Sequence, residues 1–95
     1  MIKIKAKIRL KSDVRKTGFT TGYRPLFNFI NESKTSGKIV LIEQDVFKPG
    51  EFNDVFIYFS NKDYLGSNFK VGKKFTFDEG IEIVGEGEIM EIYTD

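Results

Sequence analysis

The fold of this chain is decided by the stretch Gly22-Tyr23-Arg24-Pro25-Leu26-Phe27-Asn28-Phe29. Gly22 accepts a turn conformation that other residues resist, and Pro25 fixes its own φ while it pushes the preceding residue towards extended geometry. Because a proline cannot donate to a sheet ladder, Pro25 belongs at the first residue of a strand or on a sheet edge. The two phenylalanines that follow share one face, since side chains alternate along a strand. The stretch predicts a glycine turn and a half-buried strand over residues 22–30.

Residues 2–10 carry the clearest strand pattern in the chain. Isoleucine, alanine and leucine alternate there with lysine and arginine. Alternation with period two indicates a strand that turns one face to the core. The other face of this predicted strand is uniformly basic.

Four further apolar segments predict strands: Lys38–Glu43, Val55–Phe59, Phe69–Phe77 and Glu82–Tyr93. The β-branched run in the first of these predicts burial on both faces, and the slipped alternation in the last predicts a bulge near residues 87–89. Polar, turn-rich segments predict connections at Ser12–Thr21, Asn31–Gly37 and Ser60–Asn68, with turns at Pro49-Gly50 and Asp78-Glu79-Gly80. Six or seven short strands without a helical period predict an all-β sandwich or small barrel.

Size and composition limit the possible functions. Ninety-five residues predict one domain over residues 1–95, with a core that relies on ten Phe and four Tyr. The chain has no cysteine for a disulfide or a thiolate zinc site, and no histidine, the commonest general base and metal ligand. The net charge of +1 argues against a general binder of polyanions. No run approaches the ~18 apolar residues of a membrane helix, which predicts a soluble, cytoplasmic protein.

The opening stretch and later segments resemble one known family. Thr21–Phe29 is similar to a segment of the C-terminal, third β-barrel domain of elongation factor Tu, and similar segments follow in the family's order at Thr35–Leu41, Phe47–Glu51, Lys74–Gly80 and Val84–Gly87. The resemblance covers nearly all 95 residues and implies a six-stranded antiparallel Greek-key β-barrel. In the full factor this domain packs on the GTPase domain and contacts aminoacyl-tRNA. The present sequence has no phosphate-binding loop motif, so nucleotide hydrolysis is not expected.

The resemblance also implies a surface for a protein partner. The loops that meet the GTPase domain in the family correspond to Arg15–Thr21 and the strand around Thr76, with Asp78–Glu82 alongside. We therefore expect a non-enzymatic protein-binding module that acts as a mimic or regulator in translation. Carboxylates replace both arginines of the family's basic segment within Asp78–Glu82, which disfavours inherited tRNA binding. The predicted partner-binding residues are Arg15, Lys16, Thr17, Phe19, Tyr23, Arg24, Thr76, Asp78 and Glu82.

RNA or tRNA binding through the basic first strand is the alternative function. Its candidate residues are Lys3, Lys5, Lys7, Arg9, Lys73 and Lys74. In the family that the chain resembles, the first and last strands are neighbours, so Lys5, Lys7 and Arg9 are expected to face the carboxylates of Glu86, Glu88 or Glu91. Opposite charges across a ladder stabilise a sheet by roughly 0.2–1 kcal/mol per pair. The charge pattern is therefore interpreted first as strand pairing and second as a nucleic-acid site.

No catalytic site, cofactor or metal is expected. The acids that come closest to a catalytic pair are Asp45, Glu51 and Asp54, which flank a predicted turn, where acids are common for local reasons. The same loop lacks the ligand spacing of a calcium-binding loop. No serine lies in a recognisable nucleophile motif. A role as one segment of a larger polypeptide stays open beside the two binding functions.

Overall fold

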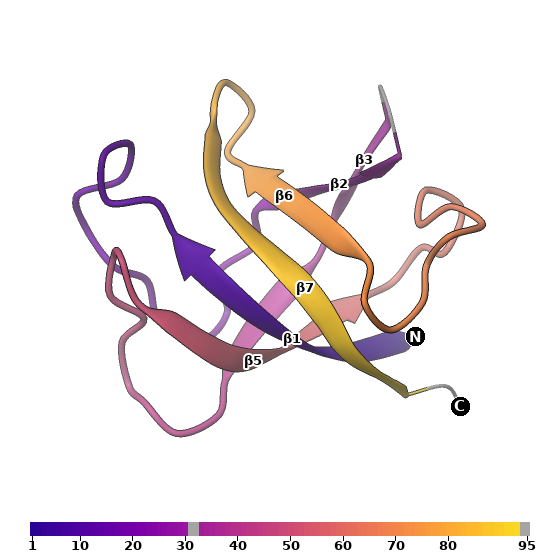
Figure 1. Ribbon diagram of the computed structural model, residues 1–95, viewed down its shortest axis with the longest axis horizontal. Coiled ribbons are helices and arrows are strands. Elements are labelled where there is room, and N and C mark those ends of the chain that lie inside the picture. Colours follow the sequence, from indigo (N-terminus) through magenta and orange to yellow (C-terminus); the bar gives the residue numbers. More distant parts are fainter. Residues whose placement is uncertain (31–32, 94–95) are drawn as a thin grey trace.

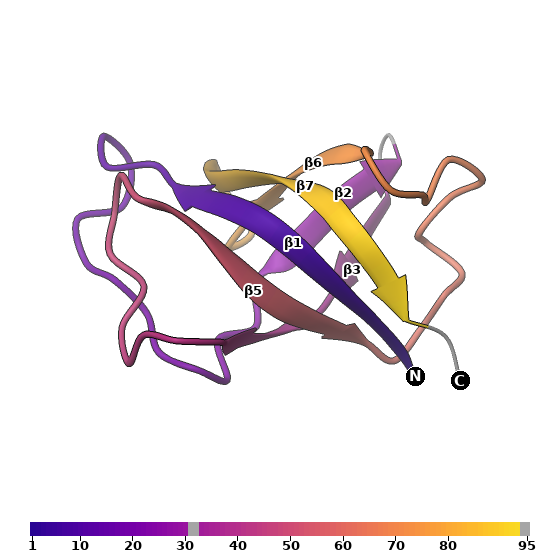
Figure 2. The same cartoon turned by 60° about the horizontal axis from the view of Figure 1, so that its bottom comes forward.

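The computed structural model describes residues 1–30 and 33–93. Their regular structure consists of seven β-strands: β1 (Ile2–Leu10), β2 (Leu26–Ile30), β3 (Ser33–Ser36), β4 (Lys38–Leu41), β5 (Phe52–Phe59), β6 (Lys74–Asp78) and β7 (Ile83–Tyr93). The strands form one antiparallel sheet in the order β3-β2-β6-β7-β1-β5-β4, which curls into a barrel-like shape (Figure 1, Figure 2). The all-β prediction is confirmed. Within these two ranges the structure contains no helix that could span a membrane.

The two edge strands of the sheet, β3 and β4, follow each other directly in the chain. Gly37 alone separates them. Its amide donates to the carbonyl of Pro25 at 3.4 Å, and the amide of Ile39 donates to the carbonyl of Tyr23 at 2.9 Å. A Cβ on Gly37 would lie 2.7 Å from Cε1 of Phe59, so the backbone approaches the core at this point more closely than a side chain allows. The chain itself therefore connects the two edges of the curled sheet.

Strand β3 lies in the polar segment Asn31–Gly37, which the sequence predicts as a loop. Residues 31–32 of that segment lie outside the described residues. In the remainder, Thr35 pairs with Phe27 and is buried, and Ser36 pairs with Leu26. Thr35 is itself a residue type that favours strands, and pairing with β2 outweighs the weaker strand preference of Lys34 and the serines. The loop prediction is wrong here, and the described part of the chain forms seven strands where the resemblance implies six.

Strand β1 lies inside the sheet, between β5 and β7. Its core-facing residues are fully buried: Ile4, Ala6, Ile8 and Leu10. On the outer face, the register with β7 sets cations opposite carboxylates: Lys5 opposite Glu91, Lys7 opposite Glu88 and Arg9 opposite Glu86. The predicted alternation of residues 2–10 and the predicted pairing of the first strand with the last are both confirmed.

The core of the sheet is filled by phenylalanine rings. The ring of Phe27 is central, because its centroid lies 5.3 Å from that of Phe59, 5.6 Å from Phe77 and 5.8 Å from Phe75. The ring of Phe29 lies 5.1 Å from Phe75 and extends the same cluster. Such distances are typical of favourable aromatic pairs, each of which adds roughly 0.5–1.5 kcal/mol beyond its buried area. The predicted aromatic core is confirmed.

Several strand boundaries differ from those that the sequence predicts. The strand predicted over residues 22–30 begins at Leu26, after a turn in which Gly22 has a φ of +104°. The predicted strand Lys38–Glu43 ends at Leu41, and its burial on both faces is wrong, because Ile42 is 38% exposed. The predicted strand Phe69–Phe77 shrinks to β6, since Phe69 packs against the core from a loop.

The bulge predicted near residues 87–89 is present in β7, one residue further along. Lys5 pairs with Glu91 and Ala6 with Ile89, so the β1–β7 ladder skips Met90. The extra residue brings Ile92 back onto the core side of the strand, although it lies three positions after Ile89.

We predict that Gly85→Ala destabilises the protein by about 1–3 kcal/mol, the usual range for overpacking a core. Gly85 pairs with Phe77 across β6 and β7, and a Cβ at position 85 would overlap the buried Phe77 ring. Urea unfolding of the variant measures the loss. Phe77→Leu provides the control, because it makes room for the new methyl group. If the two substitutions prove additive in the double variant, the close approach of ring and glycine is not the cause.

Candidate functional site

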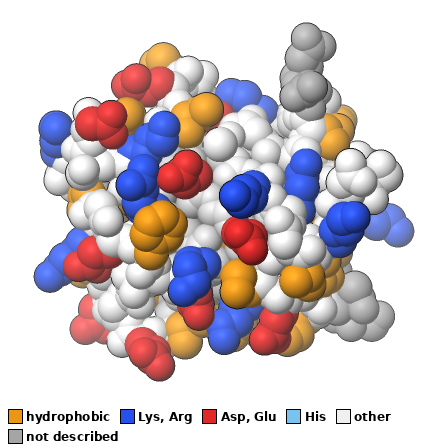
Figure 3. Space-filling view, viewed as in Figure 1, with side chains coloured by type: hydrophobic (Ala, Val, Ile, Leu, Met, Phe, Trp, Pro, Cys, Tyr) orange, Lys and Arg blue, Asp and Glu red, His pale blue; other side chains and the backbone are white. Residues whose placement is uncertain are grey.

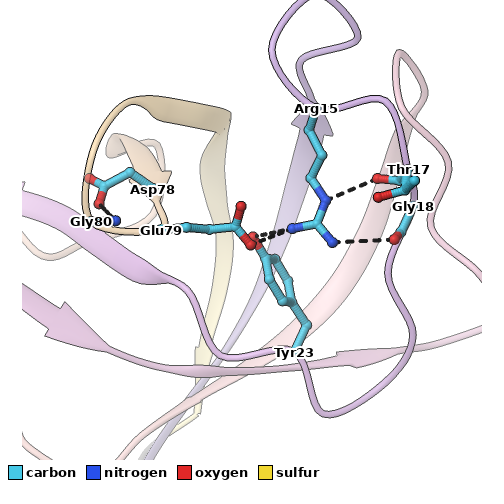
Figure 4. Close-up of polar contacts among 7 residues, drawn as sticks. All are labelled: Arg15, Thr17, Gly18, Tyr23, Asp78, Glu79 and Gly80. Carbon is cyan, nitrogen blue, oxygen red and sulfur yellow. Dashed lines mark hydrogen bonds and ion pairs between the residues drawn. The ribbon is translucent and has the colours of Figure 1, made fainter.

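Arg15 connects the loop after β1 to the hairpin between β6 and β7 (Figure 4). One terminal nitrogen, Nη1, donates to the phenol oxygen of Tyr23 at 3.0 Å and forms an ion pair with Glu79. The Nε–H group donates to the carbonyl of Thr17 at 2.9 Å, and Nη2 donates to the carbonyl of Gly18 at 3.4 Å. The guanidinium also lies 4.8 Å from the centre of the Tyr23 ring. All three guanidinium nitrogens thus have partners within the protein, and Arg15 holds the two segments together.

Tyr23 anchors the same loop to the core through stacked rings. Its ring centroid lies 4.4 Å from that of Phe19, which lies 5.1 Å from that of Phe47. The backbones of Phe19 and Phe47 exchange two hydrogen bonds, at 3.1 and 2.8 Å. Burial, reinforced by the hydrogen bond with Glu79, raises the pKa of the Tyr23 phenol far above its usual value. Tyr23 therefore stays neutral at physiological pH and acts as a structural contact of Arg15.

Asp78 organises the other side of this hairpin. Its carboxylate is 2% exposed and accepts hydrogen bonds from Asn28 Nδ2 at 2.9 Å, from Lys34 Nζ at 3.1 Å and from the amide of Gly80 at 2.8 Å. Burial alone would raise the pKa of Asp78, but the hydrogen bonds and the Lys34 charge outweigh burial and hold the pKa below its usual value. Asn28 Nδ2 also donates to Thr76 Oγ1 at 3.1 Å. Asp78 thus joins β6, β2, β3 and the hairpin turn into one unit.

The structure divides the predicted partner-binding residues into surface and interior positions. Lys16, Thr17, Arg24 and Glu82 are exposed, whereas Tyr23 and Thr76 are half-buried. Phe19 and Asp78 are buried, so they support this region from inside. The contact between Arg15 and Glu79 brings the predicted loop and the predicted hairpin together, although the two residues are 64 positions apart.

Two exposed apolar residues, which lie in or beside the segments that Arg15 connects, were not predicted as site residues. Ile81 lies in the hairpin turn and is 97% exposed, and Val46 is 42% exposed. Val46 borders the loop, since a Cβ on Gly18 would lie 3.0 Å from Val46 Cγ1. We call the surface formed by Lys16, Thr17, Val46, Ile81 and Glu82 the hairpin–loop face. The signal available in the sequence was an isoleucine inside a turn that otherwise holds Asp, Glu and Gly.

The alternative RNA-binding residues do not form one basic surface. Lys7 lies 3.7 Å from Asp54, and Arg9 lies 3.2 Å from Glu86. Lys73 precedes β6 and Lys74 is its first residue, and β7 lies between β6 and β1 in the sheet. An open trough of about 740 Å³ runs between them, lined among others by Lys7, Lys73, Lys74, Phe52, Glu86 and Glu88. Positive and negative side chains alternate over this face (Figure 3), so it does not favour a polyanion.

The acids that came closest to a catalytic pair do not form a metal site. Asp45 and Glu51 are exposed in the loop before β5, and Asp54 lies within β5 beside Lys7. Across residues 1–30 and 33–93, no group of three or more acidic side chains lies close enough together to hold a metal ion. The region around Arg15 has a guanidinium whose three nitrogens all have partners, a neutral phenol and a buried carboxylate, and this arrangement can present a rigid surface.

We predict that Arg15→Leu lowers the free energy of unfolding by about 1–3 kcal/mol, because it removes charged hydrogen bonds while it keeps most of the packing volume. Amide hydrogen exchange over residues 16–21 should become faster, since the loop loses its connection to Glu79. Chemical denaturation and hydrogen-exchange mass spectrometry measure the two effects. Lys16→Ala is the matched control, because exposed Lys16 donates only to the carbonyl of Ser12. An Arg15→Leu protein as stable as the Lys16→Ala protein would contradict this assignment.

We predict that Asp78→Asn removes part of the acid sensitivity of the protein. A carboxyl with a folded-state pKa below its unfolded value contributes stability above the unfolded pKa and loses it as the pH falls through the folded pKa. At pH 7 the variant should be less stable by about 1.5–3 kcal/mol, the usual effect of hydrogen bonds to charged groups. The difference in melting temperature should shrink as the pH is lowered below about 4. A constant difference from pH 7 to pH 2 would show that the charge of Asp78 is not the cause.

No known protein-family model matches this chain. The resemblance to the third domain of elongation factor Tu therefore stays a prediction. The function proposed below therefore rests mainly on the geometry of the hairpin–loop face.

Proposed function

We propose that this chain is a non-enzymatic protein-binding module that uses the hairpin–loop face. The observation that carries the proposal is Ile81, a large apolar residue that is 97% exposed on a hairpin held by Arg15 and Asp78. Single exposed apolar residues are common on protein surfaces. This one differs because the two segments around it are fixed to each other and to the core before any partner binds.

The physical chemistry of the face suits a protein partner. Burial of a fully exposed isoleucine side chain contributes roughly 1.5–3 kcal/mol. A surface that is already rigid loses less conformational entropy on binding. Lys16, Thr17 and Glu82 are exposed on the two segments that Arg15 connects, and they can supply the polar rim that interfaces usually have. An apolar anchor with a polar rim is the common arrangement at a binding hot spot.

The resemblance to elongation factor Tu suggests which kind of partner binds. By that analogy the chain is a six-stranded Greek-key barrel in which β3 and β4 count as one bent strand through Gly37. The loops that meet the GTPase domain in the family correspond to Arg15–Thr21 and Asp78–Glu82, which lie side by side here. The chain would then act in the cytoplasm as a mimic of that domain, or as a regulator, before a translation component. The link to translation rests on fold analogy alone.

We predict that Ile81→Glu prevents capture of the protein partner without unfolding the module. The wild-type chain and each variant are immobilised on a solid support and incubated with a lysate of the source cells. Bound proteins are then quantified by mass spectrometry. The partner should fall at least tenfold with Ile81→Glu, since the charge replaces the apolar anchor. Thr17→Asp tests the loop side of the same face, and Thr76→Arg tests the adjacent strand.

Val71→Glu is the matched control, because Val71 is an exposed apolar residue in the loop between β5 and β6. It should retain every protein that the wild type binds. Retention of every protein by Ile81→Glu and Thr17→Asp would rule out the hairpin–loop face. If Ile81→Glu loses a partner that is unrelated to translation, the hairpin–loop face is a binding site but the elongation factor analogy is refuted.

A further inference from the structure

The outer face of the central strands is divided into two parts by its ion pairs. Near the end of β1, Lys7 and Arg9 pair with Asp54 and Glu86. Near the start of β1, Lys3 and Lys5 form no ion pair with any acid among residues 1–30 and 33–93, and neither does Lys38 on β4. Within β1, ion pairs thus neutralise Lys7 and Arg9, whereas Lys3 and Lys5 have no ion-pair partner among the described residues.

Aromatic rings lie around Lys3 and beside Lys38. The ammonium nitrogen of Lys3 lies 4.1 Å from the ring centre of Phe56, 5.0 Å from that of Tyr93 and 5.7 Å from that of Tyr58. The Nζ atom of Lys38 also lies 5.7 Å from the centre of the Tyr58 ring. The sheet register explains this arrangement, because Lys38, Tyr58, Lys3 and Tyr93 face one another across β4, β5, β1 and β7.

We call Lys3, Lys5, Lys38, Phe56, Tyr58 and Tyr93 the lysine–aromatic cluster. Glu91 pairs with Lys5 across the ladder and accepts a hydrogen bond from the phenol of Tyr93. Glu43 and Asp54 line a pocket together with Lys5, but within the described ranges no carboxylate forms an ion pair with a lysine of the cluster. Arg9 also lies over a ring, that of Phe52 at 5.5 Å, but Arg9 forms an ion pair with Glu86. The cluster differs from that part of the outer face because its cations lie beside rings without an ion pair.

We propose that the lysine–aromatic cluster binds single-stranded nucleic acid. Proteins that bind single strands combine cations along the phosphate backbone with rings on which bases stack. A duplex would present phosphates to the lysines but would keep its bases away from the rings. An acidic peptide would likewise use the lysines, yet it has no flat group for the rings. The cluster offers both kinds of contact, and single strands of RNA or DNA are the ligands that use both.

Lys3 changes partners in this proposal. Its ammonium group occupies the space over Phe56 in which a base would stack. Lys3 is half-buried rather than desolvated, and a cation over an aromatic ring is held strongly only where water is excluded. A stacked base, by contrast, changes affinity by roughly 5- to 150-fold when its aromatic partner is removed. Lys3 therefore leaves the ring at little cost and meets a phosphate, while the base takes its place.

The cluster is separate from the hairpin–loop face. The loop that contains Arg15 follows the end of β1, whereas Lys3 lies near the start of the same strand (Figure 1). The two surfaces thus lie towards opposite ends of β1. Binding at the cluster does not depend on the proposed protein partner, and variants of one surface serve as controls for the other.

The test is fluorescence anisotropy with labelled 15-nucleotide oligo(U) and oligo(dT) at 50 and 200 mM salt. Engagement of Lys3, Lys5 and Lys38 predicts a slope of about −2 for log K against log salt, from ~0.7 released ions per phosphate contact on single strands. Tyr93→Leu should weaken binding roughly tenfold through lost stacking. The double variant Lys3→Gln/Lys5→Gln should weaken binding at least tenfold and reduce the salt slope. Far-UV circular dichroism and thermal melting confirm that each variant is folded, and Lys38→Gln on β4 is the substitute if changes in β1 impair folding.

The matched control is Lys73→Gln/Lys74→Gln, which removes the same charge away from the cluster. Its affinity should stay within about twofold of the wild type. The proposal is overturned if neither oligonucleotide binds at 50 mM salt, or if the two double-lysine variants lose affinity equally. If duplex DNA binds with the same affinity as the oligonucleotides, the cluster is an unspecific site for polyanions. The same conclusion follows if poly-glutamate displaces the oligonucleotide equally well from the wild type and from the Tyr93→Leu variant.

Discussion

The antiparallel pairing of β1 with β7 is the constraint on which the rest of the structure depends. It joins the first and the last strand of the chain in the centre of the sheet. Because the strands are antiparallel, the end of β1 lies beside the start of β7, and Arg15 reaches Glu79 there. For the same reason the start of β1 lies beside the end of β7, and Lys3 reaches Tyr93. Both candidate surfaces are consequences of one strand pairing.

Burial holds this pairing together more strongly than charge does. The half-exposed pair of Arg9 and Glu86 belongs to a class that contributes roughly 0.2–1 kcal/mol. A fully buried aliphatic side chain such as Ile8 or Ile89 contributes roughly 1.5–3 kcal/mol. A slip of one residue in β1 would turn its lysines towards the core. The bulge at Met90 also favours the observed register, because it turns the side chain of Ile92 back towards the core. The charges on the outer face thus agree with a register that the core already determines.

The parts of this fold that the sequence predicted are those whose patterns are local. The alternation of residues 2–10 specifies β1 completely, and the turn at Gly22 follows from its own backbone. Strand β3 could not be predicted in this way, because its polar residues become a strand only through pairing with β2. The candidate site behaves similarly. The sequence named Arg15 and Tyr23, but the partner that fixes their role, Glu79, is distant in the chain and meets them only through the β1–β7 pairing.

The contrast between Arg15 and Lys3 shows how the surroundings of a cation separate structural from binding roles. Both lie over tyrosine rings, at 4.8 and 5.0 Å. Arg15 also has a carboxylate, a phenol and two backbone carbonyls as partners, so its removal would take four hydrogen bonds from the contact between the loop and the hairpin. Lys3 has only rings and, within the described ranges, no carboxylate partner. A cation whose nitrogens all have partners fixes the fold around it, whereas one held by rings alone keeps its charge available for an anion from outside.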